Sequence, residues 1–248
     1  MNVEAGAQSN PDEGEAMFGK DFTLEFSQLS IRRAFIRRVF ILVSIMFLTV
    51  TIMCAIPMSI PGVKQWYLDN GLWIYIPSAI VFVVFSLLMS CVTSIRRSFP
   101  ANMICLAIFT LAAGLMVSAI TVTYTVQSVL LALAITTACS ASVVIFAIFI
   151  KKDLTSMMGI AFLLGICLFF YGIVAIIACV AFNVTFLYTI YALLGSLLFM
   201  FYLAIDVQLL MGNRRYSISP EEHVFAAMNI FLDILNIFLL LLSVIGEN

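Results

Sequence analysis

The chain has 248 residues, of which 64% are hydrophobic and only 10% are charged, and its net charge at pH 7 is −1. Soluble domains carry about 25% charged residues, so this composition excludes a water-soluble enzyme. The few basic residues are scattered in pairs, which excludes a nucleic-acid-binding surface.

Residues 1–29 form an acidic segment without helical periodicity. Six acidic residues stand against the single Lys20 there, among glycine, serine, asparagine and proline. We expect this segment to be a disordered cytosolic tail that precedes a membrane domain over residues 30–248. It lacks the apolar core and cleavage site of a signal peptide, so the first span is expected to be an uncleaved anchor.

Seven apolar stretches follow, each able to cross a hydrocarbon core of about 30 Å at about 1.5 Å per residue. Backbone groups in lipid must be hydrogen-bonded within their own segment, so each stretch is predicted to be a helix of an all-α bundle. We place the spans at residues 39–56, 74–95, 102–124, 129–150, 157–178, 186–211 and 222–245.

Lysine and arginine predict the orientation of this bundle. Eleven of them lie on the side of the N-terminus and only Lys64 lies on the other side. The positive-inside rule therefore predicts a cytosolic N-terminus and, if all seven segments cross, a C-terminus on the opposite side. The tail after residue 245 carries no basic residue, so a re-entrant last segment stays open.

Two acidic residues lie inside the predicted spans, Asp206 in the sixth and Asp233 in the seventh. An acid there costs about 2.5–3.5 kcal/mol on insertion scales, which makes it a functional candidate. Both fall in the cytosolic half of helices joined by a short loop, so we expect them to be neighbours. Two such carboxyl groups resist double ionisation and are expected to share one proton, and thus to sense pH. They could also bind calcium weakly and transiently, since a tight calcium site needs six to eight oxygens.

Polar residues near the two acids form a candidate supporting face. Asn229, Asp233 and Asn236 are spaced four and three apart and share one side of a helix, and Tyr202 lies one turn before Asp206. The purely structural alternative is that the aspartates only hydrogen-bond across helices and so hold the bundle together.

Other charged residues lie at the cytosolic ends of the spans. Arg96 and Arg97 end the second span and either pair with the aspartates as latch partners or only mark the topology. Ser219 is expected to cap the last helix, with Glu222 completing a capping box. The sequence contains no recognisable nucleophile–base pair, metal cluster or phosphate loop, so we expect neither an enzyme nor a cofactor.

The block from Ile205 to Asn236 resembles the signature of the transmembrane BAX inhibitor motif family, and residues 211–215 are most similar to its Lifeguard branch. Segments 31–39, 96–102, 129–136 and 151–155 support the resemblance. It implies a seven-helix calcium leak in intracellular membranes (endoplasmic reticulum, Golgi or endolysosome) that protects against apoptosis. In this family the paired aspartates, matched by Asp206 and Asp233, are held to be a pH-responsive latch with a second-span arginine, matched by Arg96 or Arg97.

The sequence departs from the Lifeguard pattern in its tail, which is short and not proline-rich, and at His223, where the branch often has tyrosine. Our leading hypothesis is a pH-modulated calcium leak, with calcium as the permeant ion and the lipid bilayer and apoptosis-regulating membrane proteins as partners. The alternative is an interaction protein that restrains cell-death signalling without conducting ions. A seven-span ligand receptor is disfavoured because the outer loops are short.

Overall fold

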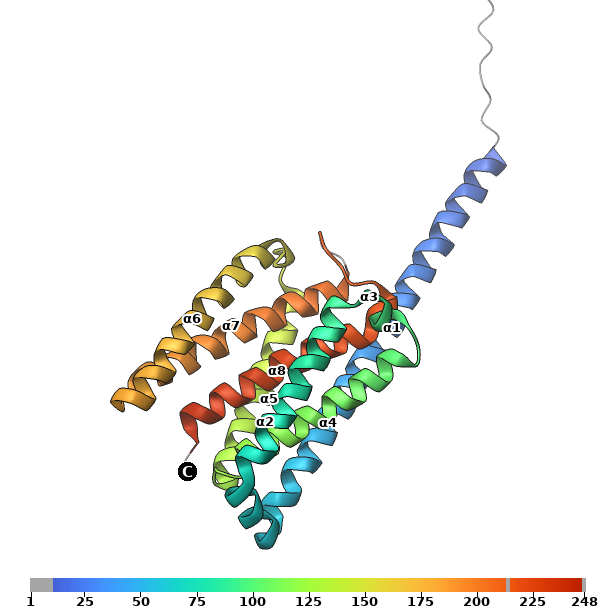
Figure 1. Cartoon of the computed structure of the whole chain (residues 1–248). Coiled ribbons are helices and arrows are strands. Elements are labelled where there is room, and N and C mark those ends of the chain that lie inside the picture. The colour runs from blue at the N-terminus through green and yellow to red at the C-terminus, as the bar shows by residue number, and fades with distance from the viewer. Residues whose placement is uncertain (1–10, 213–214, 247–248) are drawn as a thin grey trace, which may run out of the picture.

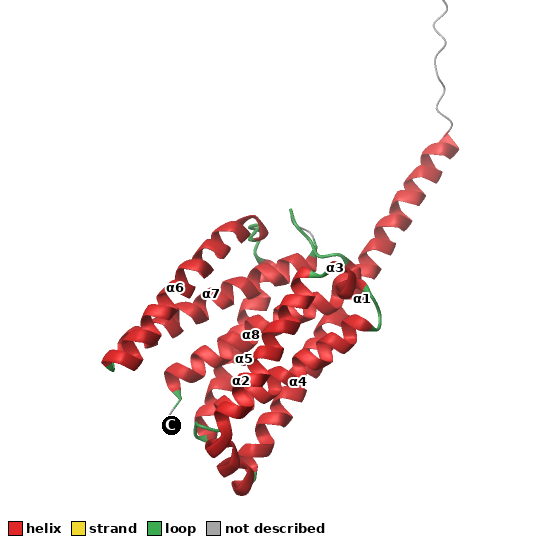
Figure 2. Ribbon diagram, viewed as in Figure 1, coloured by secondary structure: helices red, strands yellow, loops and turns green. Residues whose placement is uncertain are grey.

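The structure, a computed structural model, describes residues 11–212 and 215–246, with side chains from residue 30 onward. Within these ranges every regular element is helical, and the long helices form one bundle (Figures 1 and 2). The elements are α1 (Pro11–Ser59), α2 (Pro61–Cys91), α3 (Thr93–Arg97), α4 (Ala101–Thr121), α5 (Val126–Phe149), the 3-10 turn η1 (Thr155–Met157), α6 (Met158–Phe182), α7 (Thr185–Met211), the 3-10 turn η2 (Pro220–Glu222) and α8 (His223–Ile245).

Seven of the described helical stretches are long and apolar enough to cross a membrane, which confirms the predicted all-α seven-helix class. Their exposed surface is apolar as well: on α6, Phe162, Leu163, Phe169 and Phe170 are each more than 60% exposed. A continuous apolar surface of this kind is typical of a protein embedded in lipid. The stretches are Ser30–Ser59, Pro61–Cys91, Ala101–Thr121, Val126–Phe149, Thr155–Phe182, Thr185–Met211 and Pro220–Ile245.

The predicted boundaries differ most at the first two helices. α1 begins at Pro11, so residues 11–29 of the expected disordered tail continue the first span as helix, because extending an existing helix adds one hydrogen bond per residue. Residues 1–10 lie outside the described residues. α2 begins at Pro61, which suits a first helical turn, and kinks at Asn70. Val92 is extended and ends α2, so Arg96 and Arg97 stand on the separate short α3.

α8 lies at the centre of the bundle, packed against α7, α1, α5 and, over a shorter stretch, α4 (Figure 1). It is one helix of 23 residues, about 34 Å long at 1.5 Å per residue, which favours a full crossing over a re-entrant segment. One of its faces carries large buried side chains that pack on α1, α2 and α4, at a spacing of four and three: Val224, Met228, Phe231, Leu235, Phe238 and Leu242.

The opposite face of α8 packs against α7 and positions the candidate site. Ala226 and Ala227 are small and buried there, together with Ile230 and Ile237. Small residues let two membrane helices approach closely. Asp233 follows the same spacing, three residues after Ile230 and four before Ile237, so it belongs to the face that meets α7.

Candidate functional site

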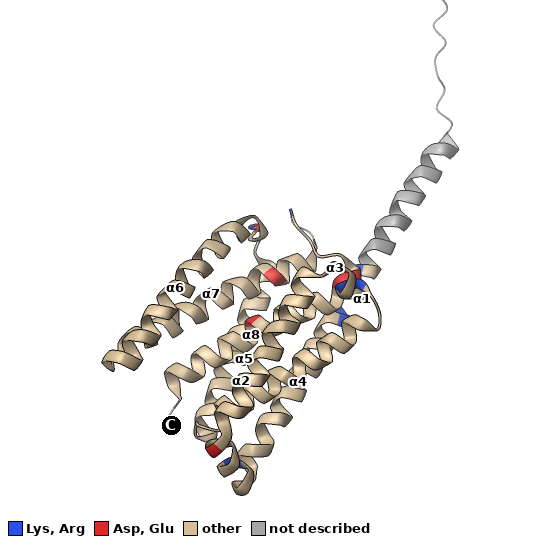
Figure 3. Ribbon diagram, in the orientation of Figure 1, with Lys and Arg blue, Asp and Glu red and all other residues tan. Residues whose placement is uncertain are grey.

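Asp206 of α7 and Asp233 of α8 lie together between the two helices. Their carboxyl groups are close enough to interact with each other. Asp233 is only 7% exposed, and its Oδ2 has no hydrogen-bond partner among the described residues. Two carboxylates cannot donate to each other, so a bond between them requires a proton on one of the two. Figure 3 shows that acidic positions are rare along the long ribbons of the bundle and that most of the coloured charges gather near the ends of the helices.

The turn between α7 and α8 fixes the register that brings the two acids together. Gly212 ends α7 with φ 76°, a conformation that favours glycine. A Cβ at this glycine would run into the guanidinium group of Arg32. Arg32 donates to the carbonyl of Ile218 at 2.8 Å, and the amide of Ile218 donates to the carbonyl of Leu209 at 3.2 Å. The first membrane helix therefore holds the turn in place.

The supporting polar residues lie near the pair without bonding to it. Tyr202 is close enough to Asp233 for an electrostatic interaction, but its hydroxyl donates to the carbonyl of Ala161 on α6 at 2.8 Å. Asn236 donates to a carbonyl of its own helix at 2.7 Å. Asn229 and Asn236 are both half-buried. These residues contribute polarity around the aspartates rather than direct hydrogen bonds.

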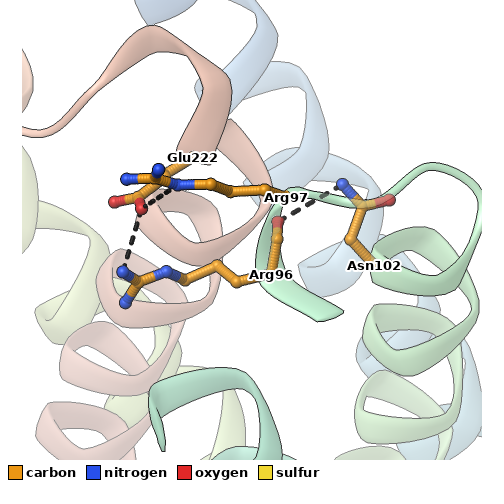
Figure 4. A network of polar contacts seen from close by, with 4 residues as sticks. All are labelled: Arg96, Arg97, Asn102 and Glu222. Carbon is orange, nitrogen blue, oxygen red and sulfur yellow. Dashed lines mark hydrogen bonds and ion pairs between the residues drawn. The ribbon is translucent and has the colours of Figure 1, made fainter. Parts of the chain in front are cut away.

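Arg96 and Arg97 pair with Glu222 and with neither aspartate (Figure 4). Arg96 Nη2 and Arg97 Nε each lie 2.9 Å from the same oxygen, Glu222 Oε1. The guanidinium of Arg96 also stacks over the ring of Phe225, 4.5 Å from its centroid. This corrects the predicted pairing with the aspartates. Asp233 lies eleven residues beyond Glu222, about 16 Å at 1.5 Å per residue, whereas α3 packs against η2, just before α8 begins.

Glu222 therefore has a different role from the predicted capping box. Ser219 makes no side-chain cap, and the amide of Glu222 donates to the Ser219 carbonyl at 2.9 Å. The carboxylate is free to join α3 to η2, and Asn102 supports α3 by donating to the carbonyl of Arg96 at 3.5 Å. The feature of the sequence that could have predicted this ion pair is the presence of two arginines and one glutamate on the same predicted side of the membrane.

Gln208 is a buried polar residue that the sequence reasoning missed. It is 1% exposed, and its side chain accepts from the amide of Leu154 at 2.7 Å. It also donates to the carbonyls of Lys152, at 3.0 Å, and Ala147, at 3.4 Å. Gln208 thus attaches the α5–α6 connection to α7, two residues beyond Asp206. The presence of a glutamine within an apolar span was the feature of the sequence that could have indicated this role.

Asp153 joins the two connections on this side of the bundle. Its carboxylate accepts from the hydroxyl of Thr155 at 2.6 Å and from the amide of Arg215 at 3.1 Å. The hydrogen bond from the Thr155 hydroxyl, followed by those from backbone amides, lowers the pKa of Asp153. We call the end of the bundle with α3, η2 and Asp153 the basic end, and the opposite end the far end.

Residues 32–248 match the family model described as "Inhibitor of apoptosis-promoting Bax1". The chain belongs to this family. It is 37% identical to Protein lifeguard 3 of Homo sapiens over 223 residues, which cover 90% of the chain and 71% of that protein. Identity to Protein lifeguard 3 of Mus musculus is 36%, with coverages of 90% and 72%. Identity to Protein lifeguard 4 of Mus musculus is 31% over 224 residues, with coverages of 88% and 86%.

The family model confirms the predicted BAX inhibitor family, and the identity to Protein lifeguard 3 confirms the resemblance to the Lifeguard branch. The family consists of anti-apoptotic integral membrane proteins and is a regulator or channel class rather than an enzyme class. The matched residues include Asp206, Asp233, both arginines of α3 and Glu222.

A resident metal ion has no adequate set of ligands in the described part of the chain. Residues 11–212 and 215–246 contain no group of three or more His, Cys, Asp or Glu that could hold one. Asp206 and Asp233 offer at most four carboxylate oxygens, whereas calcium takes six to eight.

Proposed function

We propose that this protein is a pH-modulated calcium leak channel of intracellular membranes and that it protects cells against apoptosis. The single observation that carries the channel proposal is the contact between two acidic side chains, Asp206 and Asp233, inside the membrane-spanning bundle. Family membership supports the cytoprotective part. The basic end carries almost all of the lysine and arginine residues, so we place that end, and with it the N-terminus, in the cytosol.

The gate works through one proton. While Asp206 and Asp233 share it, the hydrogen bond holds α7 against α8 and the pathway is closed. When the proton leaves, two negative charges about 4 Å apart repel by roughly 4 kcal/mol at an effective dielectric constant of about 20. A conformational equilibrium separated by a few kcal/mol responds to a term of that size. Calcium flux therefore increases with pH, because the shared proton dissociates as the pH rises. The ionised carboxylates then attract calcium.

The test is calcium flux into proteoliposomes as a function of pH, with Asp206→Asn and Asp233→Asn beside the wild type. Each variant keeps the shape of the side chain but cannot reach the doubly charged state, so flux should lose its pH dependence. Asp69→Asn is the matched control, because Asp69 is an exposed acid on α2 that accepts from Gln65 at 3.0 Å, away from the aspartate pair. Flux that keeps its full pH dependence in both variants disproves the gate.

The second candidate is a membrane interaction protein that restrains cell-death signalling without conducting ions. The observation that favours it is an open apolar groove between α6 and α7, about 420 Å³ in volume, which Leu164, Leu168 and Leu197 help to line. Such a groove can accept the helix of a partner. This candidate predicts that protection of cells survives in a folded double variant with both aspartates replaced by asparagine, whereas the channel proposal predicts its loss.

A further inference from the structure

α5 carries two buried hydroxyl groups that make no hydrogen bond. Thr136 is 2% exposed and Ser140 is 5% exposed, and neither side-chain oxygen has a partner among the described residues. Their neighbours behave differently: Thr137 donates to the carbonyl of Leu133 and Ser142 to that of Ala138, each at 2.8 Å. A bond to the carbonyl four residues earlier is the usual solution for a hydroxyl in a helix, and Thr136 and Ser140 do not make it.

These two hydroxyl groups belong to the side of α5 that faces the aspartate helices. α5 packs chiefly against α7 and α8. The five buried residues of α5 form a stripe along one side of the helix: Ser128, Ala132, Thr136, Ser140 and Ala147. A stripe of this kind must face α7 and α8, while the exposed Thr137 and Ser142 face away from the bundle.

The bond from Gln208 to the Ala147 carbonyl sets the level of the stripe relative to the aspartates. α5 and α7 run in the same direction, and Asp206 is two residues before Gln208, so it is level with the region of Ala147. At 1.5 Å per residue, Ser140 and Thr136 lie about 10 Å and about 16 Å beyond Ala147, and thus about 7 Å and about 13 Å beyond the level of Asp206, toward the far end of the bundle. The hydroxyl groups therefore continue outward from the aspartate pair along the same interface.

A buried hydroxyl without a partner is costly in an apolar bundle, by about 1–3 kcal/mol. Two such hydroxyls lie on α5, and Oδ2 of Asp233 on α8 is a further buried oxygen without a hydrogen-bond partner among the described residues. Buried polar groups of this kind are the usual binding sites of internal water, which makes about three hydrogen bonds per molecule. Hydroxyl and carboxylate oxygens also suit calcium, which prefers oxygen ligands.

We propose that Thr136 and Ser140 line the outer half of the pathway that the aspartate pair gates, where their hydroxyl groups bind water and thereby support a hydrated cation. This inference rests on the proposed channel function and extends it to a helix that carries no charged residue within its span. We call the row of oxygen-bearing side chains formed by Asp206, Asp233, Ser140 and Thr136 the hydrated track. The aspartates form its inner end, and the hydroxyls of α5 extend it toward the far end of the bundle.

The first test removes the two hydroxyl groups at nearly constant volume. Thr136→Val with Ser140→Ala should lower calcium flux in proteoliposomes by roughly tenfold, because two hydrogen-bonding groups for passing water are lost. The pH at which flux changes should stay the same, since the aspartates are untouched. The matched control is Thr137→Val with Ser142→Ala, which removes the same groups from the outer side of the same helix and should leave flux unchanged. Equal flux in the two double variants overturns the proposal.

The second test measures hydration without relying on calcium. Ser140→Cys and, as control, Ser142→Cys are placed in a chain whose six native cysteines, all free, are replaced by alanine. A charged, membrane-impermeant methanethiosulfonate should modify the cysteine at position 140 at least about tenfold faster, because a thiol facing lipid stays protonated and unreactive. Circular dichroism and gel filtration verify that each variant is folded.

The two tests separate this proposal from the channel itself. If position 140 is labelled but the wild type conducts no calcium at any pH, the hydrated track stands and the channel function fails. If the wild type conducts through the aspartate gate while position 140 resists labelling and the double variant conducts normally, the track is wrong and the channel stands.

Discussion

Replacing Glu222 by glutamine should destabilise the protein, because this one carboxylate holds two arginines. The side chains of Glu222 and Arg96 are 9% and 15% exposed, whereas that of Arg97 is 52% exposed. Breaking a buried ion pair on one side costs about 3–5 kcal/mol, while an exposed pair contributes about 0–1 kcal/mol. The Glu222–Arg96 pair therefore dominates. Since glutamine keeps one hydrogen-bonding oxygen, we expect a loss of about 3 kcal/mol.

For a protein of this size, about 3 kcal/mol corresponds to a fall in Tm of roughly 6–12 °C. Thermal unfolding in detergent, followed by far-UV circular dichroism, measures it. Arg97→Gln should shift Tm by less than about 4 °C, and Glu221→Gln, at the exposed neighbouring position, should leave it unchanged. A Glu222→Gln variant that melts together with Glu221→Gln would refute the reasoning.

Three further predictions concern the turns at the basic end. Gly212→Ala forces an L-residue into φ 76° against the Arg32 guanidinium, so Tm should fall by several degrees; an unchanged Tm would mean that the turn is not constrained. Gln208→Leu leaves the partners of three hydrogen bonds unsatisfied, and we expect a loss of about 3 kcal/mol, read as a lower Tm; the conservative Gln208→Glu at low pH should recover part of it. The hydrogen bond from the Thr155 hydroxyl lowers the pKa of Asp153 in the folded protein. Ionised Asp153 therefore adds to the free energy of unfolding above the ordinary pKa of 3.8, and this contribution is lost as the pH falls through the lower folded pKa. The decrease in Tm on acidification should be shallower in Asp153→Asn than in the wild type.

Hydropathy alone predicts the seven helices, because each span must be both apolar and long, and both properties are visible in the sequence. The ends of the helices are harder to predict. The sequence predicts that the second span begins at residue 74, but α2 begins at Pro61. A hydropathy pattern marks the apolar part of a helix and does not show how far the helix extends into the aqueous phase. The break at Val92 separates Arg96 and Arg97 from α2 without any proline or glycine at that position.

The candidate site likewise has residues that the sequence predicts and residues whose role depends on tertiary packing. The two aspartates are recognisable as candidates because an acid is unusual in a span, and their levels in two neighbouring helices follow from counting residues. The pairing of Glu222 with the arginines of α3 depends on how two distant segments pack, and so does the attachment of Gln208 to the α5–α6 connection. The hydroxyls of Thr136 and Ser140 differ from those of Thr137 and Ser142 only through the rotation of α5 in the bundle.

The proposed gate depends most on one proton held between Asp206 and Asp233. Infrared difference spectroscopy on the reconstituted protein detects protonated carboxyl groups in apolar surroundings and can be recorded over the same pH range as calcium flux. We expect a protonated carboxyl band near neutral pH that disappears as the pH rises, in step with the increase in flux, and that is absent from the double asparagine variant. A band that persists while the channel opens, or a spectrum that the double variant leaves unchanged, would contradict the account.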